Sequence, residues 1–165
     1  MADENRPDIH YYHLGQSTIE QALPLLIDKA WQQGWTCWVK SDDISLLKRM
    51  DKLLWQGEPT DFIPHRMIIS EGDEESMVHI ERNRIILSPS DGVGSRHQSR
   101  IVFLLQGAKL PAKLETYPFE RICRLFNGNH EVALKKARAD WVEDKKKGYG
   151  LCYWQQGSAG WQKIQ

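Results

Sequence analysis

The sequence of 165 residues carries no net charge and no long apolar run. Its 22 basic and 22 acidic residues balance. A protein that grips DNA mainly through phosphates carries a basic excess, so direct nucleic-acid binding is not the first expectation. The apolar runs are far too short to span a bilayer, and the residues from Met1 to Glu4 lack the basic and apolar regions of a signal peptide. We therefore expect a cytoplasmic protein.

Cysteines are few. Cys37, Cys123 and Cys152 are widely separated and include no C-x-x-C pair. An odd, scattered set argues against a disulfide framework and against a zinc site. Small buried hydrophobic side chains in a reducing compartment are the favoured interpretation, and no metal is predicted.

Enzyme motifs are scarce. The sequence contains no phosphate-binding G-x-x-x-x-G-K-S/T loop, no nucleophile elbow and no H-E-x-x-H. Residues 92–94, Gly-Val-Gly, lack the third glycine of a dinucleotide motif. Asp42 and Asp43 follow a predicted strand and could hold magnesium in a metal-dependent or nucleotide-handling α/β enzyme, although helix capping also accounts for them. That enzyme is the alternative hypothesis, and no cofactor is predicted.

Strand and helix patterns alternate in the first half of the chain. Residues 8–14 form an aromatic and branched strand, and Ser17 with Glu20 forms an S-x-x-E capping box before an amphipathic helix. A second strand covers residues 35–40, and apolar residues at helical spacing follow over 44–54. The pattern predicts a three-layer Rossmann-like α/β fold, with a mostly parallel sheet and helices on both faces.

The second half is less regular. We expect one domain over residues 1–165, in which about 155–165 form a flexible C-terminal tail. The expected elements are an acidic loop over 71–76, short strands over 77–80 and 85–87, a polar loop over 88–99, a central strand over 100–105, a strand over 119–126 and a helix from Asn129.

That last helix has two distinct faces. His130, Ala133, Leu134, Ala137 and Trp141 share a face that would dock on the sheet. The adjacent face carries a basic stripe of Lys135, Arg138, Lys145 and Lys146. A solvated helix face is the plain interpretation. The sharper one is a site for an acidic peptide, in which an arginine offers a bidentate fork to a carboxylate.

A second candidate site lies between the predicted helix over 44–54 and the next strand. Trp55 ends the helix, and Phe62 and Pro64 precede the strand. Core packing explains such aromatics, but large aromatics on the rim of a sheet also anchor protein partners. His65 has no second ligand at metal spacing, so a hydrogen-bonded structural histidine is expected.

The pattern from Leu54 to His65 resembles a known family. Leu54-Trp55, a short acidic spacer and then Phe62-x-Pro64-His65 are similar to the signature of the chi subunit of bacterial DNA polymerase III holoenzyme. Further matches occur in the family's order over nearly the whole chain, at residues 11–14, 29–35, 137–141 and 153–156.

The resemblance implies a non-catalytic accessory subunit of the clamp-loader assembly, monomeric on its own and touching DNA only indirectly. It implies binding of the psi subunit through Trp55, Phe62, Pro64 and His65, although a helicase using the same rim stays an open alternative. It also implies capture of the acidic C-terminal tail of single-stranded DNA-binding protein, through Arg138, Lys135, Trp141, Lys145 and Phe126. The family's lysine one turn before Arg138 falls on Leu134 here, so the second cation is not identified.

Overall fold

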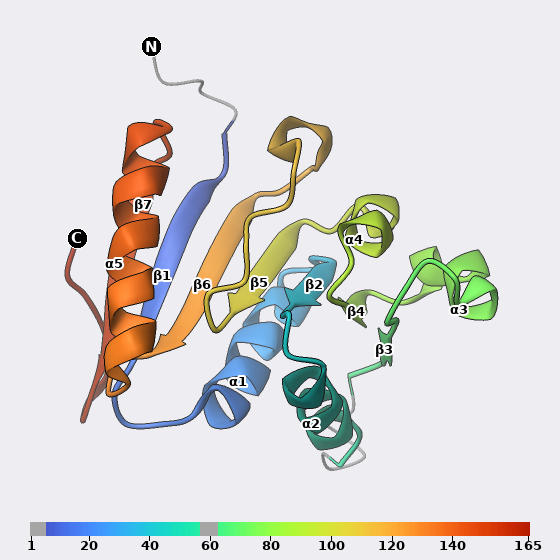
Figure 1. The fold of residues 1–165 in the computed structure, drawn as a ribbon. Helices are drawn as coiled ribbons and strands as arrows, with labels where there is room; N and C mark the ends of the chain where they lie inside the picture. Colours follow the sequence, from blue (N-terminus) through green and yellow to red (C-terminus); the bar gives the residue numbers. More distant parts are fainter. Residues whose placement is uncertain (1–5, 57–62) are drawn as a thin grey trace.

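The computed structural model describes residues 6–56 and 63–165, which form one sheet with helices on both faces (Figure 1). The strands are β1 (Asp8–Leu14), β2 (Cys37–Lys40), β3 (His65–Met67), β4 (Ile85–Leu87), β5 (Ile101–Leu105), β6 (Arg121–Asn127), β7 (Leu151–Gly157) and β8 (Gly160–Lys163). The helices are α1 (Ile19–Gln32), α2 (Ile44–Trp55), α3 (Glu74–Val78), α4 (Asp91–His97) and α5 (Glu131–Lys146), with 3-10 turns at Ile80–Arg82 and Leu114–Thr116.

The strand order in the sheet is β3-β4-β2-β5-β6-β1-β7-β8. Every pairing is parallel except that of β7 with β8. From β1 the chain passes through α1 to β2, and from β6 it passes through α5 to β7 on the other side of β1. The direction of winding therefore reverses between β1 and β6, which makes their carboxyl ends the topological switch point of the sheet.

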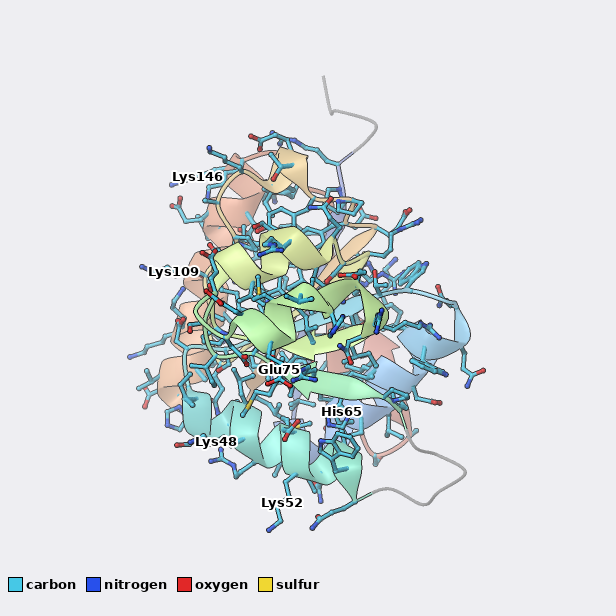
Figure 2. All side chains as sticks on the ribbon, turned by 90° about the vertical axis from the view of Figure 1, so that its right-hand side faces the viewer. Lys48, Lys52, His65, Glu75, Lys109 and Lys146 are labelled. Carbon is cyan, nitrogen blue, oxygen red and sulfur yellow. The ribbon has the colours of Figure 1, made fainter. Side chains whose placement is uncertain are left out.

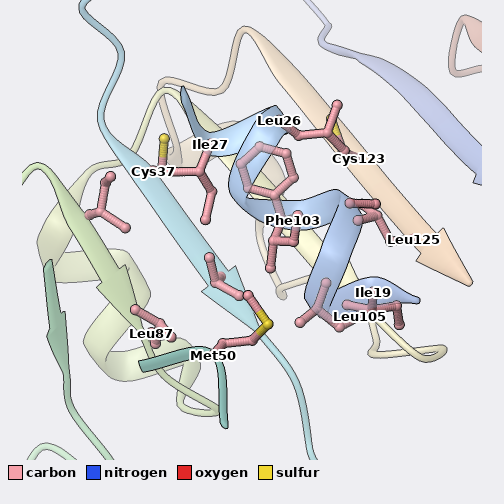
Figure 3. Packing of buried hydrophobic residues seen from close by; sticks show 14 of the residues in the cluster. Ile19, Leu26, Ile27, Cys37, Met50, Leu87, Phe103, Leu105, Cys123 and Leu125 are labelled. Carbon is pink, nitrogen blue, oxygen red and sulfur yellow. The ribbon is translucent and has the colours of Figure 1, made fainter. Parts of the chain in front are cut away.

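Alternation along the strands separates two cores. Tyr12 and Leu14 of β1 pack with α1 and α2, whereas Ile9 and Tyr11 face the side covered by α4 and α5. Figure 3 shows the first core, where Ile27 of α1, Met50 of α2 and Phe103 of β5 are in the same cluster. Because both faces of the sheet are buried under helices, the predicted three-layer fold is confirmed.

The cap of α1 differs from the prediction by one residue. Thr18, not Ser17, is the N-cap, and its Oγ1 accepts from the Gln21 amide 3.2 Å away. The Gln21 side chain accepts from the Thr18 amide in return, which completes a capping box without Glu20. The Ser17 hydroxyl instead accepts a 2.6 Å hydrogen bond from Gln156 of β7. Ser17 is thus engaged by a strand distant in the sequence and does not cap the helix.

Two short helices replace predicted strand and loop. The strand expected over 77–80 is wrong, because Asp73 caps α3 and that segment is helical or turn. The loop expected over 88–99 contains α4, which begins at the N-cap Ser90. Within α4, an added Cβ on Gly94 would lie 2.4 Å from the Trp38 ring, so only glycine allows this close approach.

The end of the described chain forms an antiparallel hairpin. β7 and β8 pair at the sheet edge, and the Tyr153 amide donates to the carbonyl of Gln165 at 2.9 Å. Residues 155–163 therefore lie mostly in strands, where a flexible tail was expected. His130 rather than Asn129 caps α5, and its Nδ1 accepts from the Ala133 amide. None of the helices within residues 6–56 and 63–165 has the length and the apolar composition of a membrane-spanning segment.

Candidate protein-binding sites

Helix α5 lies over the β1, β6 and β7 end of the sheet (Figure 1). A buried polar network holds it there. Asp144, 1% exposed, accepts from the Tyr11 hydroxyl at 2.5 Å and from Nε of Arg124 at 3.1 Å. Arg124 also donates to the carbonyl of Ala108 at 3.1 Å. Burial, followed by the hydrogen bond to Asp144, raises the pKa of Tyr11 and keeps the phenol protonated. These directional contacts set the register of α5 on the sheet.

A cluster of rings lies beneath and beside α5, and we call it the α5 floor: His13 of β1, Phe126 of β6, Tyr153 of β7 and Trp141 of α5. Trp141 and Tyr153 meet edge to face at 5.8 Å between ring centroids. His13 Nδ1 lies 2.7 Å from the Tyr153 hydroxyl, and its ring centroid lies 5.3 Å from that of Phe126. Phe126 is buried, whereas the other three rings are partly exposed. The floor thus offers accessible aromatic surface next to a helix.

Of the four floor residues, the sequence argument identified Phe126 and Trp141 and missed His13 and Tyr153. The available signal was alternation. His13 lies two residues after Tyr11, and Tyr153 lies two residues after Leu151, so each lies on the α5 face of its strand. Which strands are neighbours, however, follows only from the sheet order, in which β1 lies between β6 and β7.

Arg138 is the exposed cation of α5 whose charge acts on the floor. Within the described residues it makes no ion pair and no hydrogen bond. Burial and then the Arg138 charge lower the pKa of His13. Burial raises the pKa of Tyr153, and Arg138 opposes that rise. An uncompensated guanidinium therefore lies close to two floor residues, where it can pair with an anion from outside.

The other predicted cations of α5 divide into two groups. Lys135 pairs with Glu131 at 3.4 Å and Lys146 with Glu143 at 3.6 Å, so these charges are already compensated on exposed surface. Lys145 has no ion pair within the described part of the chain. It lies seven residues after Arg138 and so shares its helix face. Helical spacing thus places Lys145 two turns beyond Arg138 on one face of α5, and Lys135 differs from both in its ion pair with Glu131.

The second site lies at the end of α2. Trp55 is 55% exposed, and its ring centroid lies 4.8 Å from that of His65. His65 is 4% exposed, with Nδ1 2.8 Å from the carbonyl of Ile63 and Nε2 3.1 Å from that of Asp51. Pro64 is exposed, and Phe62 lies outside the described residues. We call Trp55, Pro64 and His65 the α2 rim. Within it, the hydrogen bond of His65 to Asp51 connects β3 with α2.

The alternative metal site finds no support from its two aspartates. Asp43 caps α2, because its Oδ1 accepts from the Leu46 amide at 3.2 Å. Asp42 is exposed at the same turn. Across residues 6–56 and 63–165, no group of three or more His, Cys, Asp or Glu side chains could hold a metal ion. The capping interpretation of Asp43 is confirmed.

At the switch point of the sheet, a hollow of about 300 Å³ is lined by residues 15–21 with Gln106, Asn127 and Asn129. Backbone amides at the start of α1 in such folds commonly hold a phosphate. Here the amides of Gly15, Gln16 and Ser17 all donate to Oε1 of Gln156, at 3.3, 2.9 and 2.9 Å. An oxygen of the chain itself takes the place of an anion, which disfavours a nucleotide-handling site there.

Comparison with known families identifies the family of the chain. The family model of the DNA polymerase III chi subunit (HolC) matches residues 7–152, a stretch that contains both the α2 rim and α5. A search of curated proteins finds no match. The family match covers most of the 165 residues, and the chain therefore belongs to the DNA polymerase III chi subunit family, as an accessory subunit of that polymerase.

Proposed function

We propose that this chain is a non-catalytic bridge, which binds the psi subunit at the α2 rim and captures the C-terminal tail of single-stranded DNA-binding protein at α5. The observation that carries the second half is Arg138, an exposed cation without a partner in the described residues, beside the α5 floor. Two weak sites joined in one chain raise the effective concentration of each partner near the other. The bridge would keep the polymerase assembly near coated template strands.

At α5 the tail would be held by charge and by aromatic contact. Acidic groups of the tail, including its terminal carboxylate, would pair with Arg138 and, two turns further on, with Lys145. The terminal phenylalanine would lie against the partly exposed rings of His13, Trp141 and Tyr153. Lys135 contributes little in this scheme because Glu131 already compensates its charge.

At the α2 rim the anchor would be Trp55. A large aromatic side chain with 55% of its surface exposed, held beside a buried histidine, is the type of residue that dominates protein interfaces. Psi is the proposed partner. A helicase at the same rim is the competing outcome, and titration with each protein separates the two.

The test of the tail site is calorimetric titration with a peptide that ends Asp-Ile-Pro-Phe, and with the same peptide lacking its final Phe. The wild-type chain should bind the first with micromolar affinity, about −8 kcal/mol, and the binding should weaken as salt rises. Arg138→Ala and removal of the Phe should each abolish measurable binding. Lys135→Ala is the matched control and should bind as the wild type does. Equal binding by Arg138→Ala would disprove the tail site.

A further inference from the structure

Helix α2 carries a basic stripe that leads to Trp55. Lys48, Lys52 and Trp55 stand at positions i, i+4 and i+7, so they lie on one face of the helix. All three are exposed, and Figure 2 shows Lys48 and Lys52 extending from α2 on the side of the molecule where β3 carries the buried His65. We call these three residues the α2 stripe. The opposite face of α2 is buried, so the stripe is held in a fixed orientation.

The two lysines of the stripe are not compensated. Neither makes an ion pair or a hydrogen bond within residues 6–56 and 63–165. Their neighbours are engaged: Arg49 pairs with Glu20 at 3.2 Å, and Asp51, the one acidic residue of α2, lies 3.2 Å from Nε2 of His65. The stripe therefore combines two uncompensated positive charges with an exposed tryptophan.

The apolar part of the stripe is Trp55, which is 55% exposed at its C-terminal end. Pro64 is exposed next to His65, whose ring contacts Trp55. Partner surfaces that match such a pattern combine acidic and apolar side chains on one face. From Lys48 to Trp55 the helix rises about 10 Å, which two turns of a partner helix would match.

We infer that the partner of the α2 rim docks an acidic amphipathic helix along α2, with carboxylates against Lys48 and Lys52 and an apolar side chain against Trp55. The inference rests on the proposed binding of a protein at the rim and specifies the chemistry of its docking segment. A nucleic acid is the competing ligand for two lysines beside an aromatic ring, and it is titrated alongside the protein partner.

The test uses the full chain and titration with psi at low and high salt. In the double variant Lys48→Glu/Lys52→Glu, affinity should fall at least about tenfold at low salt, and the weakening of binding by salt should disappear. The charge-matched control is Lys135→Glu/Lys146→Glu on α5, which should change affinity less than about twofold. Because all four lysines are exposed, unfolding temperatures should stay close to that of the wild type.

Trp55→Ala separates this inference from the proposed function. Trp55→Ala could lose binding while the Lys48→Glu/Lys52→Glu variant binds with wild-type affinity and salt dependence. In that case the α2 rim binds the partner, and the inference of an acidic docking helix is wrong. If the wild-type chain does not bind psi, the proposed function fails and the inference falls with it. Single-stranded oligonucleotide is the third titrant. Binding that Lys48→Glu/Lys52→Glu abolishes would overturn the inference in favour of a nucleic-acid surface.

Discussion

Helices α2 and α5 cover opposite faces of the sheet and are held there by different forces. The buried residues of α2 are all apolar: Leu46, Leu47, Met50 and Leu54. The buried residues of α5 are Ala137 and Asp144, and Asp144 is the centre of the network with Tyr11 and Arg124. One helix is thus bound by area removed from water and the other largely by directional polar contacts.

The difference bears on the two proposed sites. Burial of the apolar face of α2 is enough to hold Lys48, Lys52 and Trp55 outward, and no particular hydrogen bond is needed. The polar network admits one register of α5, which fixes Arg138 beside His13 and Tyr153. Such rigidity favours the binding of a short peptide end. The side chains of the site are already ordered in the folded protein, so binding loses less conformational entropy.

The largest expected effect comes from breaking the α5 network. Asp144→Asn removes the closer counter-charge of the buried Arg124 and leaves only Asp140, 3.6 Å from its Nη1, so the free energy of unfolding should fall by about 3 kcal/mol. Met50→Ala on the other face should cost about 2–5 kcal/mol through the cavity that it leaves. Urea denaturation measures both. In the folded fraction, tail-peptide affinity should fall for Asp144→Asn and stay unchanged for Met50→Ala. Equal tail binding by both variants would contradict a register-setting role of the network.

Acid should weaken the α1 side of the sheet through His10. Its Nδ1 accepts a 3.0 Å hydrogen bond from Trp154, and burial, followed by the Arg121 charge, lowers its pKa to about 4. The folded pKa lies below the unfolded one, so stability is unaffected above about pH 6.5 and falls as the pH drops from there toward 4. Between pH 7.5 and 5 the loss should be on the order of 1–2 kcal/mol. His10→Asn keeps an acceptor without titrating, and its urea midpoint should depend less on pH. An unchanged pH dependence would rule out His10 as the cause.

Gly128→Ala should disturb the α5 floor alone. An added Cβ would lie 1.7 Å from Nε2 of His13, so the ring has to move. Such overpacking costs about 1–3 kcal/mol, and tail-peptide affinity should fall while psi affinity is retained. Gly72→Ala is the control, because the nearest atom, Oγ of Ser70, is at an ordinary 3.4 Å. Calorimetric titrations with the tail peptide and with psi measure both affinities. Loss of psi binding as well would indicate general unfolding.

The smallest expected effects come from the exposed anchors. Arg138→Ala should change the free energy of unfolding by less than about 0.5 kcal/mol. Trp55→Ala should lower it by about 1 kcal/mol, because the Trp55 ring packs on His65. Arg138→Ala should nevertheless raise the pKa of His13, because the Arg138 charge is one cause of its lowering. Trp55→Ala should leave that pKa unchanged. NMR titration of the His13 ring measures the shift, and no change in Arg138→Ala would place the guanidinium away from the floor.

Local patterns predicted the long elements well. Six apolar positions spaced along one face of α1 are buried, as their helical period requires. The strand over 101–105 is buried at every residue, as expected of a central parallel strand. Short elements escaped prediction, because α3 and α4 have too few turns for a period to show. Trp161 was assigned to a loose tail, yet it packs edge to face on Tyr12 at 5.1 Å, a contact between distant positions.

The candidate sites show the same division. The basic face of α5 that contains Arg138 follows from helical spacing. The ion pair of Lys135 with Glu131 is an i, i+4 contact, which can be predicted directly from the sequence. The capping role of Asp43 is likewise local. The floor is not local, because His13, Phe126 and Tyr153 come from three strands whose order in the sheet differs from their order in the chain.

The sequence by itself determined the layers and the helix faces that carry Trp55 and Arg138, because periodicity and capping act over a few residues. Only the tertiary structure decided which charges remain uncompensated, which rings lie beneath α5, and that Gln156 fills the amide cluster before α1. These outcomes depend on contacts between residues that are far apart in the chain. Such contacts form only once the sheet order is set, and no local pattern encodes that order.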